Sequence, residues 1–238
     1  MKVSRVISEL FYPSGIKCVI CGDDLPKESR YQVCKRCELS YNTKFCQRCG
    51  RAMKNMATYC DRCQNEAVDF DIARAPFVYT GDVKKLVYRL KYGGAKYLAE
   101  VLAQFMADTY FEAQFSADVV TCVPLHPKRQ KRRGYNQAKE IAVAFSEITE
   151  VPYVDTLARI KATTNLARLN KKERAKEIEG AYALLENANV KGKNIVLIDD
   201  VFTSGATTGE CCKALKKAKC GKIFVLTFAT AKITAELY

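Results

Sequence analysis

The stretch IVLIDDVFTSGAT, residues 195–207, decides the fold class of this 238-residue chain. Four aliphatic residues indicate a buried strand, two aspartates follow them, and a Thr-Ser-Gly turn opens a helical pattern. A helix start offers free backbone N–H groups for phosphate, a glycine allows close approach, and hydroxyls can cap the remaining oxygens. Asp199 and Asp200 could accept hydrogen bonds from vicinal hydroxyls or hold Mg²⁺ through water. The stretch therefore predicts a site for a phosphorylated sugar with a diol; a plain helix N-cap beside solvated acids is the alternative.

The sequence around this stretch predicts strands that alternate with helices. Strand patterns cover 70–81, 118–125, 153–157, 181–185, 192–200 and 222–229. Helical patterns cover 82–92, 96–113, 135–148 and 206–219, and a basic loop covers 126–134. This alternation favours an α/β fold with a mostly parallel sheet and helices on both faces. Ligands of such sheets lie beyond the carboxyl ends of the strands.

Eight of the 12 cysteines form four C-x-x-C pairs before residue 64. Segments 18–37 and 46–63 repeat one frame, C-x-x-C-G followed by C-x-R-C, so each repeat contains two pairs. Two pairs supply the four thiolates of a tetrahedral zinc site, and we therefore join consecutive pairs. The predicted ligands are Cys18, Cys21, Cys34 and Cys37 for one structural Zn²⁺, and Cys46, Cys49, Cys60 and Cys63 for a second.

Three other uses of these cysteines are disfavoured. Disulfides would suit a secreted protein, but Arg5 and Glu9 interrupt the only apolar stretch of the N-terminus, so we expect no signal peptide and a cytoplasmic protein. Thioredoxin-type chemistry needs one C-x-x-C at a helix start, and the usual ferredoxin spacings are absent. Cross-braced pairing of alternate knuckles stays open. The other four cysteines are expected in the core: Cys122, Cys211, Cys212 and Cys220.

The stretch 195–207 resembles the signature of type I phosphoribosyltransferases, which bind 5-phosphoribosyl 1-diphosphate (PRPP). With the C-x-x-C knuckles, YRLKYGG (88–94) and VPLHPKR–RRGYNQ (123–137), the chain resembles the ComF family over nearly its whole length. The resemblance implies a double zinc ribbon at 1–67 and a type I phosphoribosyltransferase-like domain at 68–238. It also implies a role in uptake of single-stranded DNA during bacterial natural competence, beside a helicase-like partner.

The resemblance also implies roles for individual residues. Asp199 and Asp200 would bind the ribose hydroxyls of PRPP with Mg²⁺. The loop after the 118–125 strand would hold pyrophosphate through Lys128 and Arg129, with Arg133 next, since a diphosphate needs cations. The residues expected around the 5-phosphate are Thr203, Ser204, Gly205, Ala206 and Thr207. His126, Asn136 and Gln137 are expected to fix loop geometry, although His126 could also touch ligand.

Two departures from the family pattern leave the reaction open. Segment 158–182 matches the mobile hood over the substrate, but Leu166 and Glu177 stand where relatives tend to carry Gln and Asn. Thr203 stands where purine-salvage relatives usually carry an acid, so no general base is expected on this loop. PRPP binding is predicted, whereas turnover and acceptor are not. A metabolic phosphoribosyltransferase and a PRPP-sensing regulator are the alternatives.

The charge of the chain exceeds what one diphosphate needs. The formal net charge is +13, and KRQKRR (128–133) is the densest cationic run, with a second cluster over 168–176. The apolar fraction of 48% excludes a disordered chain. Part of the excess is expected on solvated faces; the remainder predicts salt-sensitive, sequence-independent binding of single-stranded DNA, with tyrosine or phenylalanine stacking on bases.

Overall fold

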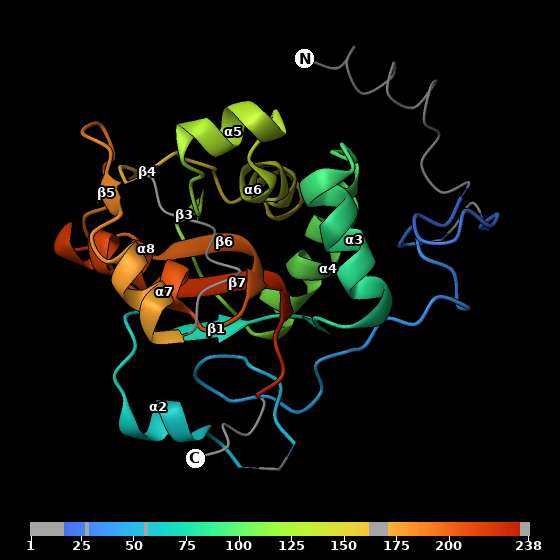
Figure 1. Ribbon diagram of the computed structural model, residues 1–238, viewed down its shortest axis with the longest axis horizontal. Coiled ribbons are helices and arrows are strands. Elements are labelled where there is room, and N and C mark those ends of the chain that lie inside the picture. The colour runs from blue at the N-terminus through green and yellow to red at the C-terminus, as the bar shows by residue number, and fades with distance from the viewer. Residues whose placement is uncertain (1–16, 27–28, 55–56, 162–170, 234–238) are drawn as a thin grey trace.

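The computed structural model describes residues 17–26, 29–54, 57–161 and 171–233 (Figure 1). Its centre is a parallel sheet with the strand order β1, β7, β6, β3. The predicted parallel α/β sheet is therefore confirmed. The strands are β1 (Ile72–Arg74), β7 (Ile223–Thr230), β6 (Ile195–Phe202) and β3 (Val119–Cys122).

One edge of the sheet is a strand that a proline interrupts. β2 (Phe77–Val78) pairs with β7 in parallel and continues the register of β1. Pro76 lies in the gap, and proline has no N–H to donate to a ladder. The strand predicted over 70–81 is therefore two short strands.

Helices cover both faces of the sheet because successive residues of the central strands point to opposite sides. In β6, Val196 and Ile198 join the core under α3, α4 and α6, whereas Ile195 and Leu197 join the core under α8. The two layers lie on either side of the sheet in Figure 1. No helix in the described ranges is long and apolar enough to cross a bilayer. The helices are α3 (Gly81–Tyr92), α4 (Leu98–Glu112), α6 (Gln137–Thr149) and α8 (Ala206–Lys217).

A small antiparallel pair lies apart from the main sheet, in the segment predicted as a hood. It consists of β4 (Leu157–Arg159) and β5 (Tyr182–Leu184), with α7 (Lys171–Ile178) between them in the sequence. The strand predicted over 153–157 is divided, since Tyr153 makes a single parallel bridge to Val120 and Leu157 begins β4. Leu166, where relatives tend to carry Gln, lies outside the described residues, and so does Arg168, the first residue of the second basic cluster.

The basic stretch predicted as a loop is instead a short helix, α5 (Pro127–Arg133). Its ends explain the difference. Pro127 occupies the first turn, the side chain of His126 accepts a hydrogen bond from the N–H of Lys128, and Gly134 ends the helix with φ 89°. Lysine, arginine and glutamine between these signals are good helix formers.

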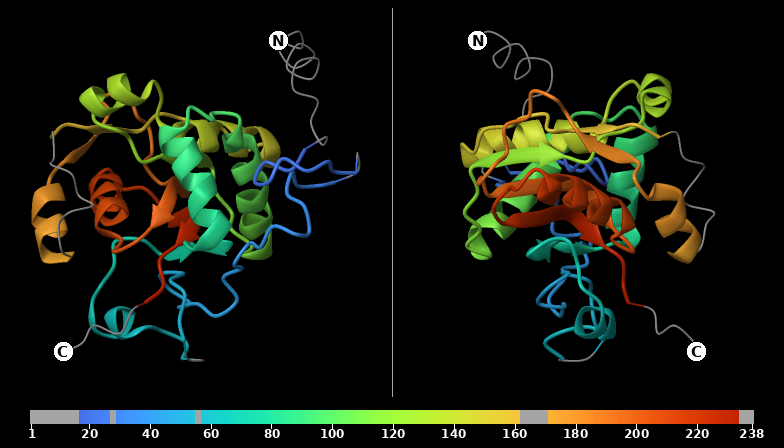
Figure 2. Two further views of the ribbon diagram at one scale, coloured as in Figure 1. Left: turned by 45° about the vertical axis from the view of Figure 1, so that its right-hand side comes forward. Right: turned by 90° about the vertical axis from the view of Figure 1, so that its left-hand side faces the viewer.

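The N-terminal segment packs against two separate parts of the α/β domain, as the left view in Figure 2 shows. Its first half contacts α4, where Tyr31 stacks on Phe105 with ring centroids 4.1 Å apart. Its second half, which includes the short helix α2 (Asp61–Asn65), lies beside β1. There the N–H of Ala73 donates to the carbonyl of Arg48 at 2.8 Å.

Candidate functional site

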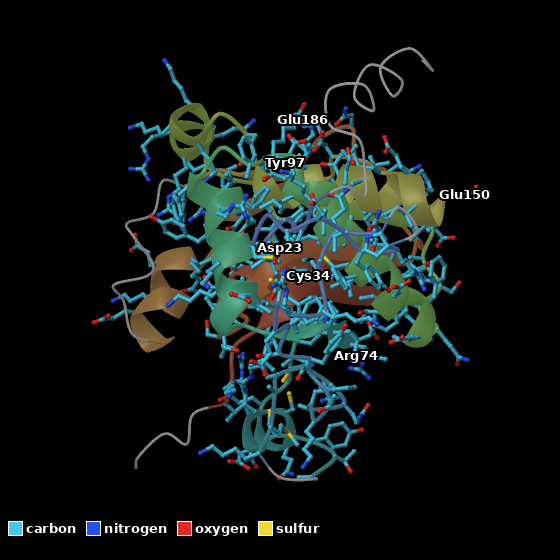
Figure 3. All side chains as sticks on the ribbon, turned by 90° about the vertical axis from the view of Figure 1, so that its right-hand side faces the viewer. Asp23, Cys34, Arg74, Tyr97, Glu150 and Glu186 are labelled. Carbon is cyan, nitrogen blue, oxygen red and sulfur yellow. The ribbon has the colours of Figure 1, made fainter. Side chains whose placement is uncertain are left out.

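Two cysteine clusters form the metal sites of the N-terminal segment. Within each cluster the four Sγ atoms lie within 4.8 Å of one another. Two Sγ–Sγ distances, 3.7 Å for Cys18–Cys37 and 3.5 Å for Cys21–Cys34, approach the edge of roughly 3.8 Å that Zn–S bonds of about 2.3 Å give a tetrahedron. The two groups of sulfur atoms are separate in Figure 3, one of them beside the labelled Cys34. The clusters are Cys18, Cys21, Cys34, Cys37 and Cys46, Cys49, Cys60, Cys63.

This grouping joins consecutive knuckles, as the repeat predicts, and does not correspond to the cross-braced alternative. Backbone N–H groups support the thiolate form, with the N–H of Cys60 at 3.4 Å from the Sγ of Cys46. A hydrogen bond with the Cys49 side chain and these N–H donors outweigh burial and lower the pKa of Cys46 to about 4. Because cysteine fills every position, the sites suit structural Zn²⁺.

A second candidate site lies at the carboxyl end of β6, where Asp200 is 4% exposed. Lys91 reaches it from α3 and places Nζ 2.7 Å from Oδ1. The other oxygen, Oδ2, is buried and has no hydrogen-bond partner within the described part of the chain. A buried carboxylate oxygen without a partner is unfavourable. This oxygen therefore suits a ligand hydroxyl or a hydrated cation.

Asp199, the neighbouring acid, is half-buried and accepts a hydrogen bond from the backbone N–H of Asp200 at 2.9 Å. Burial and the charge of Asp200 raise the pKa of Asp199 to about 7, against the opposing charge of Lys91. The positive charge of Lys91 therefore does not fully balance the two adjacent carboxylates, and a bound cation would be stabilised beside them. Their donor set fits Mg²⁺ held through water as well as a diol.

The loop 203–207 runs from the end of β6 into the first turn of α8. Gly205 has φ 76°, and a Cβ there would lie 2.7 Å from Cζ of Phe202, so this position requires glycine. The N–H of Ala206 donates to Oγ of Ser204 at 3.4 Å. The N–H groups of residues 203–205 have no partner among the described residues and could bind phosphate oxygens. Phe202, bulkier than the usual aliphatic, packs against Gly205.

The cations predicted for pyrophosphate lie on α5, and one of them belongs to a cluster of like charges. Burial and the charges of Arg159, Arg132 and Arg133 lower the pKa of Arg129. Arg159, on β4, is 7% exposed and lies over the ring of Tyr182 at 5.4 Å. Its charge also acts on Asp199. Like charges of these guanidinium groups repel each other, so an anion bound among them would be stabilised.

The other two predicted pyrophosphate contacts face elsewhere. Lys128 is exposed on α5. Arg133 hydrogen-bonds the side chain of Gln137 and lies over the ring of Tyr92, with Cζ 5.1 Å from its centroid. Among the described contacts, none joins Lys128 or Arg133 to the acid pair. Of the three, Arg129 is therefore the best placed for a diphosphate.

The polar residues around α5 fix the geometry of the chain, as expected. His126 Nδ1 accepts from the N–H of Lys128 at 3.3 Å. Asn136 caps α6, accepting from the N–H of Ala138 at 3.1 Å and donating to the carbonyl of Val123 at 3.0 Å. Of the remaining cysteines, Cys122, Cys211 and Cys212 are buried and Cys220 is half-buried.

Lys91 and Arg159 were not predicted as site residues from the sequence. Lys91 adjoins the apolar face that predicted α3 and resembles any solvated helix lysine until the fold brings it to Asp200. Lys91 belongs to the motif YRLKYGG (88–94), which indicated the family resemblance but no role for this lysine. Arg159 was part of the hood segment, and no feature of its sequence neighbourhood distinguishes it from other basic residues there.

Comparison with protein families agrees with both halves of this description. A family model described as "Double zinc ribbon domain" matches residues 7–64. A model described as "Phosphoribosyl transferase domain" matches residues 95–237, which is more than half of the chain.

Three relatives match most of the chain. Competence protein F of Haemophilus influenzae is 26% identical over 91% of this chain and 98% of its own. Competence protein ComFC of Streptococcus pneumoniae is 27% identical over 91% of this chain and 100% of its own. DNA utilization protein YhgH of Salmonella typhimurium is 25% identical over 83% of this chain and 89% of its own. The chain therefore belongs to the phosphoribosyl transferase domain family, carries an N-terminal double zinc ribbon domain, and is similar over most of its length to competence protein F and ComFC.

Proposed function

We propose that this protein binds PRPP with Mg²⁺ at the carboxyl end of β6 and assists uptake or handling of incoming single-stranded DNA in the cytoplasm during natural competence. The observation that carries the PRPP part is the buried Asp200, which has one oxygen paired with Lys91 and the other without a partner among the described residues. The pathway rests on the names of the relatives, two of which are competence proteins and one a DNA utilization protein. A helicase-like partner, implied by the family resemblance, belongs to the same proposal.

Each part of PRPP has a group suited to it. Asp199 and Asp200 would accept from the ribose hydroxyls, and loop 203–207 would surround the 5-phosphate with N–H and hydroxyl groups. Arg129 would pair with the diphosphate, with Lys128 and Arg133 nearby on the same helix. Mg²⁺ would supply further positive charge to the diphosphate when bound.

The DNA part is supported by a surface on α3 and α5 that combines exposed rings with cations. Tyr88 and Tyr92 are 61% and 62% exposed, one helical turn apart, and their ring centroids lie 5.0 Å apart. Arg133 covers one side of Tyr92. We call this the tyrosine–arginine surface and define it as Lys84, Tyr88, Tyr92, Arg132 and Arg133.

Exposed tyrosines in a row offer stacking partners to unpaired bases of any sequence, and adjacent cations attract the phosphates between them. A duplex presents no free base faces along its length, so this surface favours a single strand. Lys91 lies on the same helix as both tyrosines and reaches Asp200. A single strand on the tyrosine–arginine surface would therefore lie along the helix that contacts the proposed PRPP site.

A phosphoribosyl transfer reaction is the second candidate. It is favoured by the like-charged cluster around Arg129 and Arg159, which would stabilise pyrophosphate as it leaves. Thr203 cannot act as a general base, so the acceptor would need to be nucleophilic enough to react without general-base catalysis. Release of pyrophosphate from PRPP on adding candidate acceptors would support this reaction.

Complementation of a strain that lacks this gene tests the pathway together with the site. The proposal predicts that transformation frequency is restored by the wild-type protein and not by Asp200→Asn. If both proteins restore transformation, the competence role does not depend on the PRPP site. If neither restores it, the protein has no role in competence.

A further inference from the structure

The internal repeat of the zinc ribbons places two arginines at equivalent positions with different partners. Arg36 precedes Cys37 in the first ribbon, and Arg62 precedes Cys63 in the second, each within C-x-R-C. Arg36 pairs with Asp23 of its own ribbon, and its side chain is 78% exposed. The side chain of Arg62 is only 24% exposed. The two copies therefore differ in what this arginine does.

Arg62 leaves its own ribbon and contacts the loop proposed to hold the 5-phosphate. Its Nη1 donates a hydrogen bond to the backbone carbonyl of Ser204. Its Nε donates to Glu66 at 2.8 Å, which holds the guanidinium in place from the other side. Since Arg62 lies between the proposed zinc ligands Cys60 and Cys63, its backbone position depends on the knuckle that would hold the metal.

A second set of contacts joins the same ribbon to the same loop. Phe70, in the segment that follows the ribbon, packs edge-on against Phe202 with centroids 5.9 Å apart. The ring of Phe202 in turn lies against Gly205. The four cysteines of the second cluster also belong to the same hydrophobic cluster as Phe70 and Phe202. The loop is thus supported from the ribbon side by one charged hydrogen bond and by ring packing.

We infer that Arg62 is a positioning residue for loop 203–207, and that the second zinc site and the 5-phosphate site are energetically coupled through it. A phosphate bound by backbone N–H groups depends on their direction, and the Ser204 carbonyl belongs to the peptide unit whose N–H is that of Gly205. Arg62 fixes the plane of that peptide, which directs the Gly205 N–H to the phosphate position. The first ribbon, which has no such contact among the described residues, is not coupled in this way. The binding arm of this inference rests on the proposed PRPP function.

The test compares Arg62→Gln with its counterpart in the repeat, Arg36→Gln, in the full-length zinc-loaded protein. Amide hydrogen exchange over residues 203–207 is measured in both variants and in the wild type, together with zinc content and PRPP affinity in the presence of Mg²⁺. We expect Arg62→Gln to accelerate exchange in this loop and to weaken PRPP binding about tenfold, as loss of a hydrogen bond from a charged group predicts. Arg36→Gln should change neither measurement.

A third variant, Glu66→Gln, keeps the C-x-R-C knuckle intact and weakens only the brace on Arg62. It should give a smaller change in the same direction, and it remains informative if Arg62→Gln loses zinc. Coupling is reciprocal, so PRPP should slow the loss of one of the two zinc equivalents to a chelator and leave the other unchanged.

The outcomes separate the coupling from PRPP binding itself. Exchange over 203–207 that is identical in wild type, Arg62→Gln and Glu66→Gln would overturn the role of Arg62, whatever the affinity for PRPP. A wild-type protein that binds no PRPP would remove the proposed function, while the exchange comparison would still decide whether Arg62 positions the loop. Equal effects of the two arginine changes would show a general loss of ribbon stability and would also overturn the inference.

Discussion

Lys91 Nζ lies 2.7 Å from Asp200 Oδ1, and the two residues form an ion pair in which the Asp200 side chain is 5% exposed. α3 and β6 are far apart in the sequence, so this pair links the first helix of the α/β domain to the strand that carries the acid pair. The lysine balances one of two adjacent carboxylates and leaves Asp199 with a raised pKa. The pair therefore sets the charge of the site before any ligand binds.

Removing Lys91 should destabilise the fold. Lys91→Met leaves Asp200 buried without its partner, and loss of one member of a buried pair costs about 3 kcal/mol. The free energy of unfolding from urea titration measures this change. Lys84→Met, at an exposed position of the same helix, should alter it by less than about 0.5 kcal/mol. If both changes lower the free energy of unfolding equally, the Lys91–Asp200 pair does not stabilise the fold more than an exposed lysine does.

Metal content should follow the pairing of consecutive knuckles. The wild-type protein should bind two Zn²⁺ per chain, as native mass spectrometry can count. Cys21→Ser with Cys34→Ser removes two ligands from one site, so one zinc should remain. Cys21→Ser with Cys49→Ser damages both sites, so none should remain. A cross-braced arrangement, with the first knuckle paired to the third, would give the reverse pattern.

Two glycines near α8 should respond in opposite ways to alanine. Gly205→Ala places a side chain at φ 76° and against Phe202, and the left-handed conformation alone costs about 1 kcal/mol or more. It should lower the melting temperature and weaken PRPP binding. Gly209→Ala is the control, because its Cβ would meet only Asp69 at 3.9 Å and alanine favours a helix by up to about 1 kcal/mol. A Gly205→Ala protein as stable as the wild type would contradict the geometry of this loop.

The tyrosine–arginine surface should bind single-stranded DNA by stacking of its tyrosines on bases and by attraction of its cations to phosphates, and the two contributions can be measured separately. Tyr92→Ala should weaken binding of a labelled oligonucleotide by about 1–3 kcal/mol without changing its salt dependence. Arg132→Ala should reduce the slope of log K against log salt by about 0.7. Tyr59→Ala, an exposed tyrosine on the second ribbon, should leave binding unchanged. Fluorescence anisotropy measures all three, and anisotropy that stays flat at low salt would exclude this surface.

The sequence predicted those parts of the fold that local pattern determines. The eight cysteine ligands follow from spacing within one repeat, and β6 with its loop follows from an aliphatic run, two acids and a glycine turn. Even there the boundaries shifted, since the strand predicted over 192–200 is β6 at Ile195–Phe202.

Other features depend on contacts between distant segments and had no local signal. Lys91 reaches Asp200 only because α3 packs beside β6. Arg62 reaches Ser204 only because the second ribbon lies against the loop after that strand. α5 was predicted as a loop because charge dominated its composition, although His126, Pro127 and Gly134 are the end signals of a helix. A charge run by itself does not indicate whether the backbone is coiled.

Calorimetric titration of PRPP with Mg²⁺ into the wild-type protein and into Asp200→Asn tests the central claim most directly. The substitution keeps the shape of the side chain and removes its charge. Because it also leaves Lys91 without its charged partner, it should lower the stability of the fold, so the titration is made well below the melting temperature of the variant. The proposed site predicts saturable binding to the wild type with one PRPP per chain, and affinity reduced at least tenfold in Asp200→Asn, equivalent to about 1.4 kcal/mol. Equal heats and equal affinity for both proteins would contradict the assignment of the PRPP site to the acid pair.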